Sequence, residues 1–198
     1  MMTNVYFLRH GETDWNLEGR TQGRTDIPLN RNGELQAKES GDALKDKEID
    51  LIITSPLKRA KKTAEIVQEQ LNVDLIEREA FIELSFGDAE GMTLAEKLER
   101  FPDRIYPNSE DGASIERRFL TGLAEIHDKY HNQNVVVVSH GAFINAILYH
   151  YSNGETGTGK IKLANGGITS LKISDDKVEI LECNQVNHLS QYKKIGEI

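Results

Sequence analysis

The sequence has a single cysteine, no long hydrophobic run and no recognisable export signal. With only Cys183, no disulfide can form within the chain, so a reducing compartment is the expected location. No apolar stretch approaches the ~20 residues that a membrane-spanning helix needs. The N-terminus also lacks the basic start, apolar core and small-residue cleavage site of a signal peptide. We therefore expect a cytoplasmic protein without a membrane partner.

Basic residues are also in the minority, since 24 Lys and Arg stand against 32 Asp and Glu for a net charge of −8. General nucleic-acid binding needs a basic face, so it is not expected here. The 198 residues, with 38% hydrophobic and 28% charged, are typical of one globular domain over residues 1–198. A homodimer stays an open alternative, because twofold pairs are the commonest assembly.

Apolar runs and helical spacing alternate along the chain. Strands are predicted at residues 5–8, 51–53, 73–76, 135–138, 161–163, 168–173 and 178–181. Helices are predicted at residues 31–46, 55–71, 93–101, 114–131 and 142–151. Alternation followed by a β-rich end predicts an α/β fold with three layers, α/β/α, and a mostly parallel central sheet with an antiparallel edge strand.

Several local features of the helices are predicted as well. Leu35, Ala37 and Leu44 are expected to face inward from the first helix. Ser55 is expected to cap the second helix with Pro56 in its first turn, and Ser114 to cap the long helix near residue 114. That long helix is expected to face the core with Ile115, Phe119, Leu123 and Ile126.

Two His-Gly pairs stand at the ends of predicted strands. The first is part of Leu8-Arg9-His10-Gly11-Glu12-Thr13, and the second is Ser139-His140-Gly141. Ligands bind beyond the carboxyl ends of the strands in such sheets, and glycine lets the backbone approach a ligand closely. The two pairs predict one phosphate pocket in which a histidine attacks phosphorus.

Other residues supply groups that suit an anion. Arg9 and Arg59 have planar guanidinium groups that can each bind two phosphate oxygens. The helix that begins near Ala142 is expected to direct its free amides at the same point. Asn16 and Gln22, in the loop after the first strand, can donate further hydrogen bonds.

The chain carries a series of motifs in one order. They are Leu8-Arg9-His10-Gly11-Glu12-Thr13, Trp15-Asn16, Gln22-Gly23, Asp26-Ile27-Pro28-Leu29, Gly33, Thr54-Ser55-Pro56-Leu57-Lys58-Arg59-Ala60, Glu83-Leu84-Ser85-Phe86-Gly87, Glu90-Gly91 and Val138-Ser139-His140-Gly141. Together they resemble the histidine phosphatase superfamily, also called the phosphoglycerate mutase-like family, and in particular its small bacterial broad-specificity phosphatases.

The resemblance implies a role for each matching residue. His10 would be the nucleophile, Arg9, Arg59 and His140 would complete the phosphate pocket, and Glu83 would be the proton donor, with a pKa raised by burial and by the phosphate. The expected substrate-binding set is Arg9, Asn16, Gln22, Gly23, Arg59, His140 and Gly141. The expected ligand is a small phosphorylated metabolite, phosphate or another oxyanion, and neither a metal nor a cofactor is expected.

Some of these residues have alternatives. Glu77, Glu79, Asp88 and Glu90 compete with Glu83 for the role of acid. Arg59 is also compatible with a charge on a helix surface, and Asn16 and Gln22 with a purely structural role in their loop. We interpret His127, His131, His150 and His188 as structural.

The segment from Gly154 to Lys160 resembles the phosphate loop of nucleotide hydrolases, but Ile161 stands where the magnesium-binding hydroxyl would be. A helix also precedes it and a strand is predicted to follow, which reverses the required context. We therefore interpret this segment as a turn.

Three functions remain open from the sequence. A phosphatase is favoured, because the stretch between Leu84 and Val138 is short for a mutase and has no basic lid run, and an open pocket admits water. A phosphoglycerate mutase-type isomerase and a phospho-ligand binding protein are the alternatives. In the small bacterial phosphatases that the chain resembles, tryptophan is frequent at the position of Ala89 and glutamate at that of Ala113. Both alanines are therefore expected to reshape the entrance of the pocket. The natural substrate stays undetermined.

Overall fold

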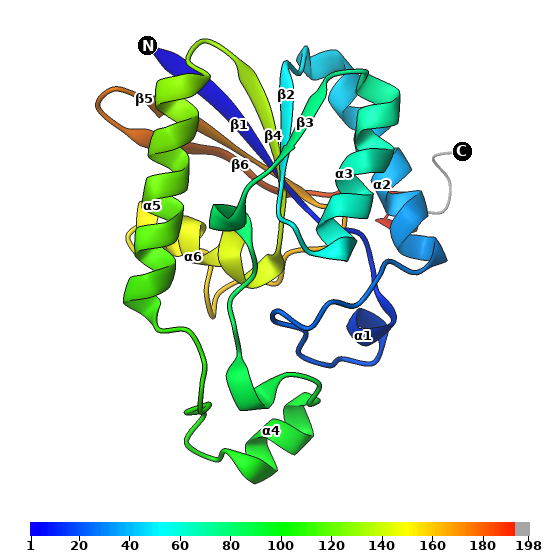
Figure 1. Ribbon diagram of the computed structural model, residues 1–198, viewed down its shortest axis with the longest axis vertical. Coiled ribbons are helices and arrows are strands. Elements are labelled where there is room, and N and C mark those ends of the chain that lie inside the picture. Colours follow the sequence, from blue (N-terminus) through cyan, green and yellow to red (C-terminus); the bar gives the residue numbers. More distant parts are fainter. Residues whose placement is uncertain (193–198) are drawn as a thin grey trace.

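The computed structural model describes residues 1–192, which form a six-stranded sheet covered by helices (Figure 1). The strands are β1 (Met2–Arg9), β2 (Leu51–Thr54), β3 (Asp74–Glu77), β4 (Asn134–Ser139), β5 (Ile168–Ser174) and β6 (Val178–Gln185). The helices are α1 (Asp14–Leu17), α2 (Arg31–Leu44), α3 (Lys58–Leu71), α4 (Leu94–Arg100), α5 (Gly112–Lys129) and α6 (Gly141–Tyr151). No helix in this part of the chain is long and apolar enough to cross a membrane.

The strand order is β3-β2-β4-β1-β5-β6. β1 pairs in parallel with β4, β4 with β2, and β2 with β3. β5 is antiparallel to both β1 and β6, so among the described strands it runs against all the others. The predicted mostly parallel sheet is confirmed, and its antiparallel part is the β5–β6 hairpin at one edge.

Two apolar layers pack on opposite faces of the sheet. Val5, Phe7, Val135 and Val137 belong to the core that includes the inward side of α5 and α6. Leu8, Ile52, Val136 and Val138 belong to the core that includes Leu44 of α2 and Ala60, Ala64 and Val67 of α3. Successive strand residues face opposite ways, which is why neighbours in sequence join different cores. The three-layer prediction is therefore confirmed, as is the inward stripe of α5.

Two local predictions are wrong. Residues 161–163 do not form a strand, because the side chains of Asn145 and Arg9 donate to the carbonyls of Ile161 and Leu163. Leu35 is 47% exposed on the outer side of α2, whereas Ala37 and Leu44 are buried as predicted.

The starts of two helices also differ from prediction. Helix α3 begins after Leu57, so Pro56 lies before it and Ser55 is not its cap. Helix α5 begins at Gly112, and the side chain of Asp111 caps it by accepting from the Ser114 amide. Serine and aspartate are both good caps, so sequence preference alone does not distinguish them.

Three parallel strands end at the same level of the sheet. Arg9 at the end of β1 is paired with Ser139 at the end of β4, and Thr54 of β2 is paired with Val138. The His10 amide donates to Ser139 O at 3.0 Å, and the Ser55 amide donates to Val138 O at 3.0 Å. The strand register therefore brings the residues that follow β1, β2 and β4 to one point.

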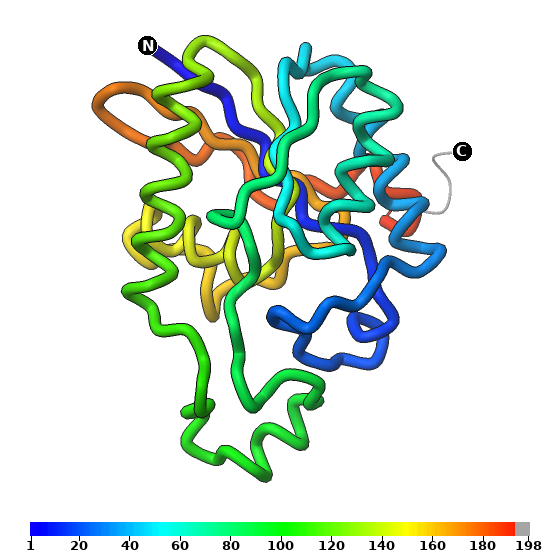
Figure 2. Tube along the Cα trace, viewed as in Figure 1, coloured from blue at the N-terminus to red at the C-terminus, as the bar shows by residue number. Residues whose placement is uncertain are grey.

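Residues 84–111 form an overhang that projects beyond this end of the sheet and includes α4 (Figure 1). The tube trace shows it beside the loop that follows β1 (Figure 2). Backbone hydrogen bonds join the two: Thr21 N donates to Met92 O at 2.9 Å, and Gly91 N donates to Thr21 O at 2.8 Å.

Candidate active site

His10 follows β1 and is almost fully buried. Its Nδ1 lies 2.7 Å from Gly11 O, which can only accept, so Nδ1 carries the proton and Nε2 is left without one. The Nε of Arg59 donates to this Nε2 at 3.3 Å. Burial and the charges of Arg59 and Arg9 lower the pKa of His10 well below its ordinary value. The imidazole is therefore neutral and offers a lone pair.

His140 follows β4, and its ring centre lies 5.2 Å from that of His10. Its Nε2 is 2.7 Å from the hydroxyl of Ser55. Its Nδ1 is buried and has no hydrogen-bond partner within residues 1–192. Burial and the nearby Arg59 lower the pKa of His140 well below its ordinary value, so this imidazole is neutral too.

Arg59, on the first turn of α3, is only 1% exposed, so it is not a surface charge. Its Nη1 donates to Thr25 O at 3.0 Å and its Nη2 to Gly23 O at 2.6 Å. Burial lowers the pKa of Arg59 to about 10, which still leaves it charged at neutral pH. Each Nη has a second hydrogen, so Arg59 can bind an anion while it holds the loop after β1.

Arg9 donates from Nη1 to Leu163 O, and its Nε is buried without a partner in the described part of the chain. A Cβ on Gly141 would lie 3.1 Å from this Nε. Gly141 therefore makes room for the guanidinium of Arg9. Glycine at position 11 was expected to let the backbone approach a ligand. The structure gives another reason, since a Cβ there would lie 2.2 Å from Gly33 O at the start of α2.

The Glu83 carboxylate accepts hydrogen bonds from the backbone amides at the start of α6, which were expected to bind the ligand. Its Oε1 accepts from Phe143 N and Leu84 N, both at 2.9 Å, and its Oε2 accepts from Ala142 N at 3.2 Å. The first turn of α6 thus holds the Glu83 carboxylate, which corrects the prediction that these amides point at phosphate. Burial raises the pKa of Glu83 above its ordinary value, although the three amides and Arg59 act in the opposite direction.

Asn16 and Gln22 lie near His10 with their side-chain oxygens already engaged. Asn16 Oδ1 accepts from Thr13 N at 3.1 Å and from Asn165 Nδ2 at 3.1 Å. Gln22 Oε1 accepts from Thr13 Oγ1 at 2.9 Å. Both side chains therefore have their NH2 groups left as donors, which suits an oxyanion.

Asn165 is a residue that sequence reasoning missed, because its Asn-Gly-Gly sequence was read only as a turn. Besides Asn16, its Nδ2 contacts His10 O at 3.0 Å. It lies before β5, whose antiparallel pairing with β1 brings residue 165 beside His10. Only the pairing of distant strands could have revealed this contact.

Gly23 has a φ of +52°, a conformation that favours glycine. A Cβ there would also lie 2.1 Å from Glu90 Oε1. Glu90 accepts from the amides of Arg24, Thr25 and Phe86, at 3.0, 2.9 and 3.0 Å. Glu90 thus clamps the loop after β1 to the overhang and is not a rival acid.

The predicted residues enclose a pocket of about 210 Å³. Its lining consists of Arg9, His10, Asn16, Arg20, Thr21, Gln22, Gly23, Arg59, Glu83, Phe86, Gly141 and Ala142. His140 lies behind this lining with no exposed surface, beside His10. Arg20, Thr21, Phe86 and Ala142 are members that the sequence analysis did not include. Neither Ala89, which is fully buried, nor Ala113 lines the pocket.

The alternatives to Glu83 lie elsewhere. Glu77 pairs with Lys61, and Asp88 accepts from Asn108. Neither they nor Glu79 line the pocket around His10.

The four histidines interpreted as structural are also outside this pocket. His127 contacts Thr3 and Asp175, and His188 contacts Ser40. His131 contacts the carbonyl of Asp128, and His150 pairs with Glu116.

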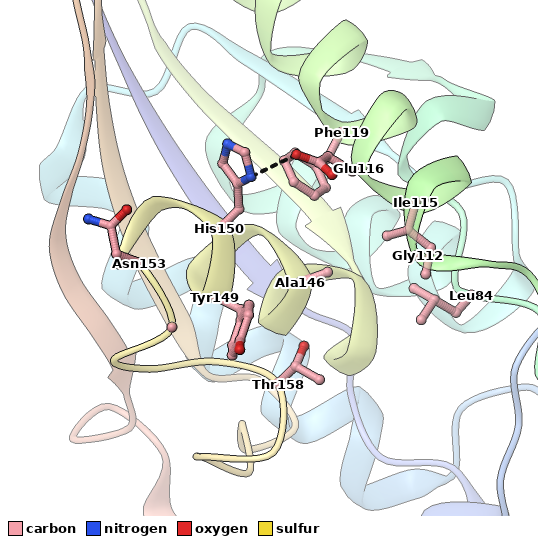
Figure 3. A pocket seen from close by; sticks show the side chains of 11 residues that line it. Leu84, Gly112, Ile115, Glu116, Phe119, Ala146, Tyr149, His150, Asn153 and Thr158 are labelled. Atoms are coloured by element: carbon pink, nitrogen blue, oxygen red, sulfur yellow. Dashed lines mark ion pairs between the residues drawn. The ribbon is translucent and has the colours of Figure 1, made fainter. Parts of the chain in front are cut away.

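The glycine-rich segment 154–160 is a series of turns after α6. Gly154, Gly157 and Gly159 all have positive φ. Gly154 and Thr158 line a separate, largely apolar pocket of about 560 Å³ between α5 and α6, which Figure 3 shows with the His150–Glu116 ion pair. The segment therefore does not reach the pocket around His10.

Comparisons with known proteins identify the family of this chain. A family model described as histidine phosphatase superfamily (branch 1) matches residues 5–186. The chain is 46% identical to an "Uncharacterized phosphatase PhoE" of Bacillus subtilis, over 98% of this chain and 100% of that one. It is 34% identical to a "Probable phosphoglycerate mutase GpmB" of Klebsiella pneumoniae, over 74% of each chain.

A solved structure is similar as well. It is a phosphoserine phosphatase variant from Entamoeba histolytica in complex with phosphoserine, with 31% identity and a TM-score of 0.81 over 94% of this chain and 99% of that one. The match of the family model spans the strand ends, the loop after β1, the overhang and both His-Gly pairs. This chain belongs to the histidine phosphatase superfamily (branch 1).

Proposed function

We propose that the protein is a phosphomonoester phosphatase that acts on small phosphorylated metabolites through a phosphohistidine at His10. The observation that carries the proposal is the unprotonated Nε2 of His10, which accepts one long hydrogen bond from Arg59 Nε at 3.3 Å, in a pocket lined by donors. The proton of this imidazole is held on Nδ1 by Gly11 O, while Arg9 and Arg59 stand beside the ring. A neutral nucleophile among fixed cations suits attack on a dianionic phosphoryl group.

In the first step, His10 Nε2 forms a bond to phosphorus while the bond from phosphorus to the ester oxygen breaks. The leaving alkoxide takes a proton from Glu83, whose raised pKa keeps a larger fraction protonated near neutral pH. Negative charge on the transferring oxygens is met by Arg9 and Arg59. Each such donor in a partly dry pocket is worth on the order of 2–4 kcal/mol.

In the second step, water attacks the phosphoryl group on His10. The Glu83 carboxylate takes a proton from this water, the bond between Nε2 and phosphorus breaks, and inorganic phosphate leaves. Glu83 is then protonated again, and His10 recovers its lone pair. The cycle consumes one water and needs no other reactant.

The relatives support a phosphatase acting on small esters. The most similar curated relative named here is described as a phosphatase, and the Entamoeba enzyme is described with phosphoserine. A phosphorylated amino acid or a small phosphorylated acid is therefore a sensible first class of substrate. The single cysteine is consistent with a reducing cytoplasm.

The second candidate is a mutase, which the similarity to a probable phosphoglycerate mutase favours. Product analysis with 3-phosphoglycerate separates the two activities. A phosphatase yields inorganic phosphate, whereas a mutase yields 2-phosphoglycerate.

The nucleophile is tested by quenching turnover of ³²P-labelled phosphoserine in alkaline detergent, which preserves phosphohistidine. We expect label on the native protein that is lost in acid, and no label on His10→Ala. Turnover of His10→Ala should fall by about 10⁴-fold or more, as for other covalent nucleophiles.

The matched control is His131→Ala, which removes an exposed histidine outside the pocket and should label normally. Label that persists on folded His10→Ala, or turnover within tenfold of the native rate, would falsify the assignment of His10.

A further inference from the structure

Ser55 lies in the short connection between β2 and α3 and is completely buried. Its hydroxyl oxygen is 2.7 Å from Nε2 of His140, the shortest contact that this imidazole makes. The sequence suggested a helix cap for Ser55, but α3 begins two residues later than that role requires. The serine hydroxyl therefore serves the histidine and not the helix start.

The protons around Ser55 can be counted. Its Oγ accepts a long hydrogen bond of 3.4 Å from Leu57 N, and its remaining contact within residues 1–192 is with His140 Nε2. A hydroxyl has one hydrogen to donate, and the only acceptor in reach is this nitrogen. If Nε2 carried a proton instead, the buried serine hydrogen would have no acceptor, which native structures avoid.

We propose that Ser55 sets the tautomer of His140: its hydroxyl donates to Nε2, so that the proton of the neutral imidazole sits on Nδ1. His140 then presents an Nδ1–H donor. This inference rests on the proposed function only for its catalytic consequence, since the tautomer itself belongs to the free protein.

The surroundings of His140 agree with this assignment. Nδ1 of His140 and Nε of Arg9 are two buried side-chain nitrogens near the site that lack a partner in the described chain. Arg9 Nε lies next to Gly141, which follows His140 directly. Arg9 Nε is a donor, so a proton on Nδ1 of His140 would give the site two neighbouring donors for one oxyanion ligand.

A doubly protonated His140 is disfavoured first by burial and then by its neighbours. Burial, and after it Arg59, His10, Arg9 and Arg118, all lower the pKa of this imidazole. A neutral donor is therefore the form that meets the phosphoryl oxygen. Ser55 is a positioning residue, because it acts on the substrate through His140.

The direct test is ¹⁵N NMR of the free protein labelled at histidine, with the His140 signals assigned by comparison with His140→Asn. We expect the native protein to show a protonated Nδ1 and an unprotonated Nε2 at His140. Ser55→Ala should lose this single tautomer and show a mixture or the reverse. A native Nε2–H tautomer, or an unchanged tautomer in folded Ser55→Ala, overturns the proposal.

The catalytic consequence is tested with the same variants. We expect kcat/KM for Ser55→Ala to fall about 10- to 100-fold, with a similar loss in vanadate affinity, because one aligned donor to the developing charge is lost. Ser55→Thr keeps a hydroxyl, so wherever it folds it should keep the tautomer and more of the activity than Ser55→Ala.

The matched control is Ser139→Ala. Ser139 is buried, and its hydroxyl donates to Phe81 O at 2.8 Å and makes no hydrogen bond to an imidazole ring within residues 1–192. The variant should keep the native tautomer and a kcat/KM within about threefold. An equal loss of activity in Ser139→Ala and Ser55→Ala would attribute the effect to packing and overturn the positioning role. If the native protein showed no phosphatase turnover, the NMR result and vanadate binding would still stand, so the two failures are distinguishable.

Discussion

The floor of the pocket and the overhang above it are built by different physical means. We use floor for the pocket residues His10 and Arg59 together with His140 and Ser55 behind them. These residues follow three adjacent parallel strands and are nearly or fully buried. The overhang, residues 84–111, exposes Leu94 by 61% and Ile105 by 71%, and α4 buries no residue in the described structure.

This difference in construction suggests that the floor and the overhang have different effects on the reaction. The positions of floor residues are fixed by strand register and by two apolar cores, so each can move little without moving the sheet. The overhang is held to the loop after β1 mainly by hydrogen bonds, among them those of Glu90. Changes in the floor should therefore alter the rate of the reaction, while changes in the overhang should alter the choice of substrate.

After the loss of His10 itself, the largest effect is expected at Glu83, directly before the overhang. Glu83→Gln cannot donate or accept the proton, so hydrolysis of an alkyl phosphate should fall by about 10²- to 10⁴-fold. In the native protein the rate should decline as pH rises through the raised pKa of Glu83, because the protonated acid disappears. The variant should lack this decline, which a pH–rate profile measures.

An activated aryl phosphate sharpens the assignment of Glu83. Its leaving group needs no proton, so Glu83→Gln should release one burst of phenol and then turn over slowly, as phosphohistidine accumulates. Glu79→Gln, which changes an exposed carboxylate outside the pocket, is the control and should behave as native. A normal steady rate without a burst in Glu83→Gln would contradict its second role.

An intermediate effect is expected at Asn165, which links the floor to the loop. Asn165→Ala removes the donor to His10 O and to Asn16 Oδ1, so the Asn16 amide loses part of its orientation. We expect kcat/KM to fall about 10-fold, in line with the loss of one fixed donor to the transition state.

Asn184→Ala is a useful comparison for Asn165→Ala, since Asn184 Oδ1 accepts from Ala164 N at 2.8 Å but does not touch His10. It should affect thermal stability without a specific loss in kcat. If Asn165→Ala kept the full rate, the role of this amide in orienting Asn16 would be refuted.

The smallest effect is expected in the overhang. The double variant Leu94→Ser, Leu98→Ser changes two exposed apolar side chains of α4. The free energy of unfolding should change by less than about 0.5 kcal/mol per site, as for other surface positions. For a small substrate kcat should stay within about twofold, which denaturant titration and steady-state assays check together. A loss comparable with that of Asn165→Ala would show that the overhang also orders the floor.

The sequence predicted which residues form the floor better than it predicted the contacts between distant side chains. His10 and His140 could be found because both follow strand-like runs and carry glycine, and parallel strands end together. The contact between Ser55 and His140 could not be found, because Ser55-Pro56 is also a good helix start and the preference for a cap is a local rule. Strand 161–163 was predicted wrongly for a similar reason: its apolar pattern is right, but distant side chains take its carbonyls.

The role of the α6 amides shows the limit of reasoning from one motif. A helix start after His140 does attract an anion, but the anion is the carboxylate of Glu83 from elsewhere in the chain. Because this contact joins residues about 60 apart in sequence, only the folded arrangement reveals it. The same contact explains why Glu83, rather than its acidic neighbours, stands in the pocket.

The strand order has a consequence for how the protein comes into being. β4 lies between β1 and β2, although the ribosome makes it after both. Until its last residues leave the exit tunnel, the two earlier strands have no shared neighbour to align them. The nascent chain therefore carries no assembled pocket during most of its translation, and His10 and His140 come together only after β4 has left the ribosome.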